Sequence, residues 1–116
     1  MIRTAAELVK SGEKSFVVFT RGPLFVYDEK GEGTTGNWTA GAGSLDEMDK
    51  VIIYKRDDLT GNNHIFMGDY EGWKQSSEPR RKIIQFSKLR EIGQTASNWV
   101  DFGGSNGGSP FFYIRK

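Results

Sequence analysis

The chain has 116 residues, of which 36% are hydrophobic and 13% aromatic, and its formal net charge is +1. This length allows one hydrophobic core, and the aromatic content favours a folded chain over a disordered one. The chain has no cysteine and one histidine, which excludes disulfides, thiolate metal sites and sites of several histidine ligands. No apolar run approaches the ~20 residues of a membrane-spanning helix, and the N-terminus lacks an apolar signal core. We therefore expect a cytoplasmic protein without a metal, a cofactor or a membrane partner.

The first elements are a short helix and two strands. Thr4 and Glu7 fit a capping box, so a helix is predicted over residues 5–11. Residues 15–20 and 24–27 are rich in β-branched and aromatic residues and predict two strands. A Gly-Pro pair lies in the short break between them, so these strands are expected to form a hairpin.

The middle of the chain begins with a glycine-rich stretch. Residues 28–43 hold five glycines and predict a long loop, because glycine loses so much freedom on ordering. Ser44 and Glu47 form a second capping-box match, which predicts a helical turn over residues 45–49. Residues 50–55 give the strongest strand, and their apolar run predicts burial on both faces.

The second half predicts further strands. Residues 64–73 alternate in polarity, and Gly68 and Gly72 within them indicate bulges or bends. The remaining predictions are a strand over 82–86, a short strand over 89–92, a glycine-rich loop over 95–108 and a last strand over 110–114. Six or seven short strands with this turn density favour one mostly β domain over residues 1–116, a small barrel with one or two short helices.

One part of the chain resembles a known family. Residues 48–55, 65–73 and 81–86 resemble successive strands of the PUA-like superfamily, in particular its EVE and ASCH types, and the likeness covers roughly residues 44–92. The usual Gly-Asp pair of that family is Met48-Asp49 here. The resemblance implies a PUA-like barrel that binds RNA or DNA. Some members hold a modified base in an aromatic pocket, and some ASCH-type members are small amidohydrolases.

An Asn-Trp pair occurs in each of the two glycine-rich stretches. Asn37-Trp38 and Asn98-Trp99 could each stack a base on the indole and hydrogen-bond its edge with the amide. We expect a cleft near both tryptophans and include Tyr54 among the candidate ligand-binding residues. The alternative is that these tryptophans only cap the ends of the barrel.

Basic residues near aromatic ones are typical of phosphate contact. The candidates for the nucleic-acid backbone are Lys55, Arg56, Arg80, Arg81, Lys82, Lys88 and Arg90. The alternative is a solvated surface, because acidic residues are interleaved with them. Asp69 and Glu71 alternate on one strand and could form a carboxylate pair, although solvent-facing acids are the commoner case. His64 is expected at the surface or rim, as a hydrogen-bonding residue.

Three functions stay open at this point. The leading hypothesis is a nucleic-acid-binding domain, and its narrower form is a modified-base reader with an aromatic pocket. The alternative is a non-catalytic protein-interaction module such as a small inhibitor or adaptor, whose partner would be a protein. A small ASCH-type amidohydrolase is the third.

Overall fold

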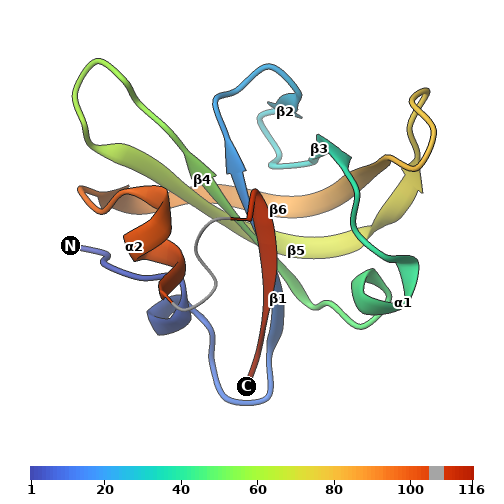
Figure 1. The fold of residues 1–116 in the computed structure, drawn as a ribbon, viewed down its shortest axis with the longest axis horizontal. Helices are drawn as coiled ribbons and strands as arrows, with labels where there is room; N and C mark the ends of the chain where they lie inside the picture. The colour runs from blue at the N-terminus through green and yellow to red at the C-terminus, as the bar shows by residue number, and fades with distance from the viewer. Residues whose placement is uncertain (105–108) are drawn as a thin grey trace.

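The structure is a computed structural model that describes residues 1–104 and 109–116 (Figure 1). The described residues form one seven-stranded sheet in the order β2-β3-β6-β5-β4-β1-β7. The strands are β1 (Lys14–Thr20), β2 (Phe25–Tyr27), β3 (Gly33–Trp38), β4 (Lys50–Lys55), β5 (Asn63–Gln75), β6 (Lys82–Thr95) and β7 (Phe111–Arg115). The helical elements are a 3-10 turn, η1 (Ala6–Leu8), and two short helices, α1 (Ala42–Leu45) and α2 (Trp99–Gly103). The prediction of a small, mostly β domain with one or two short helices is confirmed.

The predicted hairpin between the first two strands is wrong. β1 lies between β4, to which it is parallel, and β7, to which it is antiparallel, while β2 pairs with β3. The reason is burial on both faces of β1, where Val17 and Val18 are each fully buried. Such a strand belongs inside a sheet with neighbours on both edges, whereas Val26 of β2 is 59% exposed and suits a sheet edge.

The predicted loop over residues 28–43 contains β3, which was not predicted because the glycine content of this stretch is typical of a loop. Gly33 approaches β2 so closely that a Cβ atom at this position would lie 2.0 Å from the carbonyl oxygen of Val26. The glycine therefore permits the contact that pairs the two strands. The irregularity continues along β3, since its register with β6 shifts between Thr35 and Trp38.

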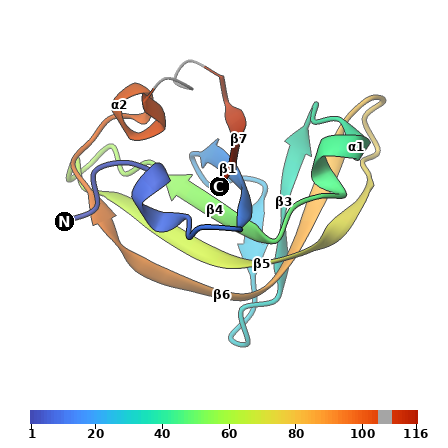
Figure 2. The same ribbon diagram turned by 90° about the horizontal axis from the view of Figure 1, so that it is seen from below.

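The bulges predicted in β5 are present. The register between β5 and β6 shifts between Met67 and Asp69 and again between Tyr70 and Gly72. The short strand predicted over 89–92 is part of β6, which continues through a positive φ of 53° at Lys88. These irregularities let the two longest strands bend (Figure 2).

Of the two helices predicted at capping boxes, the first is only a 3-10 turn, which lies inside the predicted range 5–11, and the second was misplaced. Glu7 accepts a hydrogen bond from the backbone of Arg3 at 2.9 Å, and η1 has no side-chain cap. α1 begins three residues before the predicted turn and likewise has no side-chain cap. The loop predicted over 95–108 contains α2, whose N-cap is Asn98, and residues 105–108 of that prediction lie outside the described residues.

Two hydrophobic clusters lie on opposite faces of the central strands. Cluster 1 includes Val18 and Ile53, and cluster 2 includes their neighbours Val17 and Ile52, because successive residues of a strand face opposite sides. The sheet curves, with α1 near one end and α2 near the other (Figure 2). No helix in the described ranges is long and apolar enough to span a membrane.

Candidate ligand-binding recess

The two Asn-Trp pairs do not share a cleft, so that prediction is wrong. Trp38 is 7% exposed in cluster 1, with its ring centroid 6.2 Å from that of Phe111. Trp99 packs against cluster 2, with its centroid 5.3 Å from that of Phe112. Because Phe111 and Phe112 are neighbours in β7, they point to opposite faces and separate the two indoles.

A recess does form around the second pair. It is a cavity of about 240 Å³ lined by Phe19, Tyr54, Arg56, Asp57, Asp58, Gly61, Asn63, Ala96, Asn98 and Trp99. The wall residues come from the turn between β4 and β5 on one side and from the link between β6 and α2 on the other. We call this cavity the aromatic recess. It brings together Tyr54, Asn98 and Trp99, predicted as ligand-binding residues, and Arg56, predicted as a backbone contact.

Three aromatic rings form the floor of the recess. The ring centroid of Tyr54 lies 5.8 Å from that of Phe19 and 5.4 Å from that of Trp99, and the last two are 5.6 Å apart. Tyr54 is buried, and its hydroxyl donates to the carbonyl oxygen of Ser97 at 2.7 Å. Burial raises the pKa of Tyr54, so the hydroxyl stays a neutral donor. Phe19 and Trp99 are half-buried and offer ring surface to the recess.

The orientations of Trp99 and Asn98 follow from local hydrogen bonds. The indole nitrogen of Trp99 donates to the carbonyl oxygen of Ser109 at 2.6 Å. The Oδ1 atom of Asn98 accepts from the backbone of Asp101 at 2.8 Å and so caps α2. The capping bond fixes the side chain and leaves its amide nitrogen as the remaining donor at the recess.

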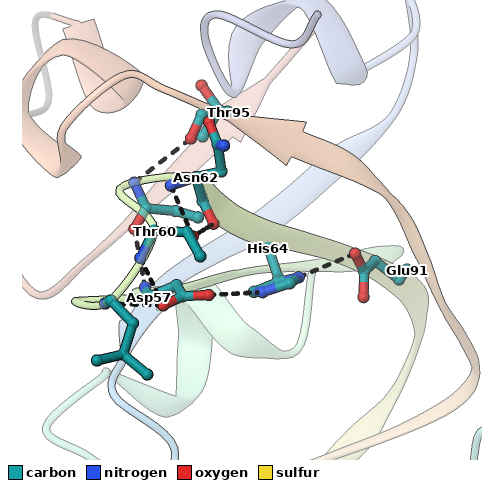
Figure 3. Close-up of polar contacts among 8 residues, drawn as sticks. Asp57, Thr60, Asn62, His64, Glu91 and Thr95 are labelled. Carbon is teal, nitrogen blue, oxygen red and sulfur yellow. Dashed lines mark hydrogen bonds and ion pairs between the residues drawn. The ribbon is translucent and has the colours of Figure 1, made fainter.

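The opposite wall is a turn held by its own side chains (Figure 3). Asp57 Oδ1 accepts from the backbone of Leu59 at 2.9 Å and of Thr60 at 3.2 Å. The Oδ1 atom of Asn63 accepts from the backbone of Asp57 at 2.9 Å, and its Nδ2 atom donates to Ser97 O at 3.3 Å. Asn63 thus links the two walls of the recess.

His64 braces this turn from the other face of the sheet. Its Nδ1 atom lies 3.0 Å from Glu91 Oε2, and its Nε2 atom lies 3.3 Å from Asp57 Oδ2 (Figure 3). The hydrogen bond to Glu91 is the largest cause that raises the pKa of His64, and Asp57 adds to it. His64 is paired with Lys55, the neighbour of Tyr54, so it lies outside the recess.

The rim carries both signs of charge. The Arg56 Nε atom lies 2.6 Å from Asp58 Oδ1, and the guanidinium of Arg21 lies 5.6 Å from the ring centroid of Phe19. Backbone hydrogen bonds from Leu59 and Thr60 are the main cause that lowers the pKa of Asp57, which therefore stays ionised. The rim thus offers guanidinium donors beside carboxylate acceptors.

The other predicted basic residues do not gather at the recess. Arg81 donates to Asn37 O at 3.3 Å, and Lys82 donates to Ala40 O at 2.7 Å, both near the β5–β6 hairpin. Lys88 lies 3.9 Å from Asp69, and Asn37 donates to Glu78 at 3.1 Å. Arg80 and Arg90 are exposed, and Lys55 lies on the sheet face opposite Tyr54.

The carboxylates considered as a pair bind different partners. Asp69 accepts from Lys50 at 2.6 Å, and Glu71 accepts from Ser87.

Phe19, Arg21 and Asn63 were missed as site residues, because no sequence signal distinguishes them from ordinary strand and turn residues. No group of three or more His, Cys, Asp or Glu side chains that could hold a metal ion occurs within the described ranges.

Comparisons with protein-family models, with curated proteins and with solved structures gave no match.

Proposed function

We propose that this protein binds single-stranded nucleic acid and holds one unpaired base in the aromatic recess. The observation that carries the proposal is the open aromatic surface of Phe19 and Trp99 over a buried Tyr54. Stacking on such rings contributes about 1–3 kcal/mol per base and tolerates many sequences. The PUA-like resemblance and the reading of a modified base stay predictions.

The polar groups of the recess suit the edge of a base and its phosphate. The amide of Asn98 and the carboxylate of Asp58 offer a donor and an acceptor at the rim. Arg21 and Arg56 flank the aromatic floor, where a guanidinium can pair with a phosphate. Because Asp58 competes for Arg56, we expect a modest affinity that depends on base stacking more than on charge.

The test is fluorescence anisotropy of labelled single-stranded DNA and RNA oligonucleotides, unmodified and base-modified, at two salt concentrations. Trp99→Ala should weaken binding by about tenfold or more, since it removes a stacking surface. Arg56→Gln should weaken binding and reduce its salt dependence, whereas Arg80→Gln, at the distant β5–β6 turn, should change little. Equal binding by Trp99→Ala and the wild type would refute the proposal.

A second candidate is a protein-interaction module, and the edge strand β2 favours it. Leu24, Val26 and Tyr27 are 52%, 59% and 49% exposed. A groove of about 150 Å³ beside them is lined by Pro23, Leu24, Val26, Thr34, Gly36, Asn37 and Ile83. Exposed apolar residues beside a groove are typical of protein contacts. Val26→Lys should leave nucleic-acid binding intact and abolish a protein complex that uses this edge.

A further inference from the structure

His64 lies between two carboxylates that come from different parts of the fold (Figure 3). Its Nδ1 atom lies 3.0 Å from Glu91 Oε2, on β6, and its Nε2 atom lies 3.3 Å from Asp57 Oδ2, in the turn between β4 and β5. A protonated imidazole donates at both nitrogens, whereas a neutral imidazole donates at one only. The protonated side chain can therefore bind both carboxylates at once, and the neutral side chain cannot.

Glu91 is the partner that a neutral His64 keeps. The distance from His64 to Glu91 is the shorter of the two. The hydrogen bond to Glu91 is also the largest cause that raises the pKa of His64, while burial lowers this pKa and Asp57 raises it further. When Nδ1 retains its proton, the lone pair of Nε2 faces Asp57 Oδ2. Loss of the proton on Nε2 thus replaces an attraction at Asp57 by a repulsion.

Two further side chains face His64 from the neighbouring strands. Its cross-strand partners are Lys55 in β4 and Gln94 in β6. Lys55 is positively charged and disfavours the proton on His64, and Gln94 is neutral. The backbone hydrogen bond from Leu59 is the largest cause that lowers the pKa of Asp57, so Asp57 stays ionised while His64 titrates.

The carboxylate of Asp57 couples His64 to the aromatic recess. Its Oδ2 atom faces His64, and its Oδ1 atom accepts from the backbone of Leu59 at 2.9 Å and of Thr60 at 3.2 Å. Because a carboxylate is rigid and planar, a rotation that moves Oδ2 away from the imidazole also displaces Oδ1 from the turn. Asn63 still holds the backbone of Asp57 at 2.9 Å, so the turn is loosened and not unfolded. This turn forms one wall of the recess, and a looser wall lowers the affinity because it must be ordered when a ligand binds.

We propose that the proton on His64 regulates ligand binding at the aromatic recess, with tighter binding when His64 is protonated. This regulation rests on the proposed nucleic-acid function, because it concerns the same recess. His64 is protonated below its folded-state pKa, which is raised above 6.5, and as the pH rises through that pKa the hold on Asp57 is lost. The side chains of His64 and Asp57 are 30% and 23% exposed. We expect the affinity to fall by about two- to fivefold, the effect of an ion pair between partly exposed groups.

The first test is fluorescence anisotropy of labelled single-stranded DNA of mixed sequence, from about pH 5 to about pH 9, a range in which the terminal amine also titrates but is kept in every variant. The wild type should bind most tightly at low pH. His64→Gln carries no charge and should bind at every pH as weakly as the wild type does at high pH. Glu91→Gln removes the largest cause of the raised pKa of His64, so its transition should move to lower pH. Glu71→Gln, the matched control further along β5, should leave the transition unchanged.

The second test needs no ligand. His64 is the one histidine of the chain, so its ring protons are identified directly in NMR spectra. In the wild type, the amide signals of Leu59 and Thr60 should titrate with the same midpoint as the ring of His64, and in His64→Gln they should stay fixed. Bound DNA should raise this midpoint, because a ligand that prefers the protonated form also increases its affinity for the proton.

Different results contradict the two proposals. DNA binding of equal strength across the pH range, or an equal pH dependence in His64→Gln, would overturn the regulation and leave the nucleic-acid proposal standing. Absence of DNA and RNA binding at every pH would refute the nucleic-acid proposal. The amide signals would then decide the regulation: signals of Leu59 and Thr60 that follow His64 support its control of the wall, and signals that stay fixed in the wild type overturn it.

Discussion

Two tyrosine hydroxyls in this chain have opposite surroundings, and removing each one tests that difference. Tyr54 is 1% exposed, and its hydroxyl donates to Ser97 O at 2.7 Å. Tyr54→Phe should therefore lower the free energy of unfolding by about 1 kcal/mol, the net value of a buried hydrogen bond. Tyr70 Oη has no partner among the described residues, so Tyr70→Phe should leave the stability unchanged or raise it by up to about 1 kcal/mol.

The assay is urea unfolding of the ligand-free protein, followed by circular dichroism, with a thermal melt as a second measurement. A difference of about 1–2 kcal/mol between the variants corresponds to about 4–8 °C in Tm for a domain of this size. Equal m-values are the control, because a changed m-value means that one variant altered the denatured or native ensemble. A Tyr70→Phe variant as destabilised as Tyr54→Phe would refute the reasoning, since its hydroxyl would then have a partner.

Four further substitutions test the fold. The folded protein raises the pKa of His64 above its ordinary value of 6.5, so the ion pairs of His64 stabilise the fold fully below pH 6.5. This stabilisation is lost as the pH rises through the folded-state pKa of His64. His64→Gln should remove this pH dependence of the unfolding free energy, measured by urea titrations from about pH 5 to about pH 9. Gly33→Ala places a methyl group against Val26 O and should cost about 1–3 kcal/mol in the same assay, whereas Gly43→Ala, which meets no atom within 4 Å, should be neutral or stabilising. Leu45→Ala empties a fully buried position and should lower unfolding free energy by about 2–5 kcal/mol.

Local composition predicted most strands, because runs of β-branched and aromatic residues are typical of strands that are buried on both faces of a sheet. Residues 50–55 are the clearest case, and β4 occupies that range. β3 was not predictable in this way, since its sequence is Gly-Thr-Thr-Gly-Asn-Trp and its strand exists only because β2 and β6 lie on either side. Pairing was also beyond local reasoning: whether β1 turns back onto β2 or runs parallel to β4 depends on partners distant in sequence.

The candidate sites show the same limit at the level of single residues. The sequence marks Asn37-Trp38 and Asn98-Trp99 as equivalent pairs, yet Asn98 caps a helix at an open recess while Asn37 binds Glu78 near a buried indole. The role of Asn98 follows from its chain neighbours, because α2 begins directly after it. The role of Asn37 follows from a contact with Glu78, which is distant in sequence.

The two tyrosine hydroxyl groups extend this argument to single atoms. Tyr54 ends an apolar run, whereas Tyr70 lies between Asp69 and Glu71, and neither local sequence tells which hydroxyl obtains a partner. Tyr54 gains one because the link after β6 brings Ser97 O over the strand, and Asn63 holds that carbonyl oxygen as well. Near α1, the carboxylate of Asp46 instead accepts from the indole nitrogen of Trp73. Segments distant in sequence from both strands therefore decide which of the two hydroxyls is paired.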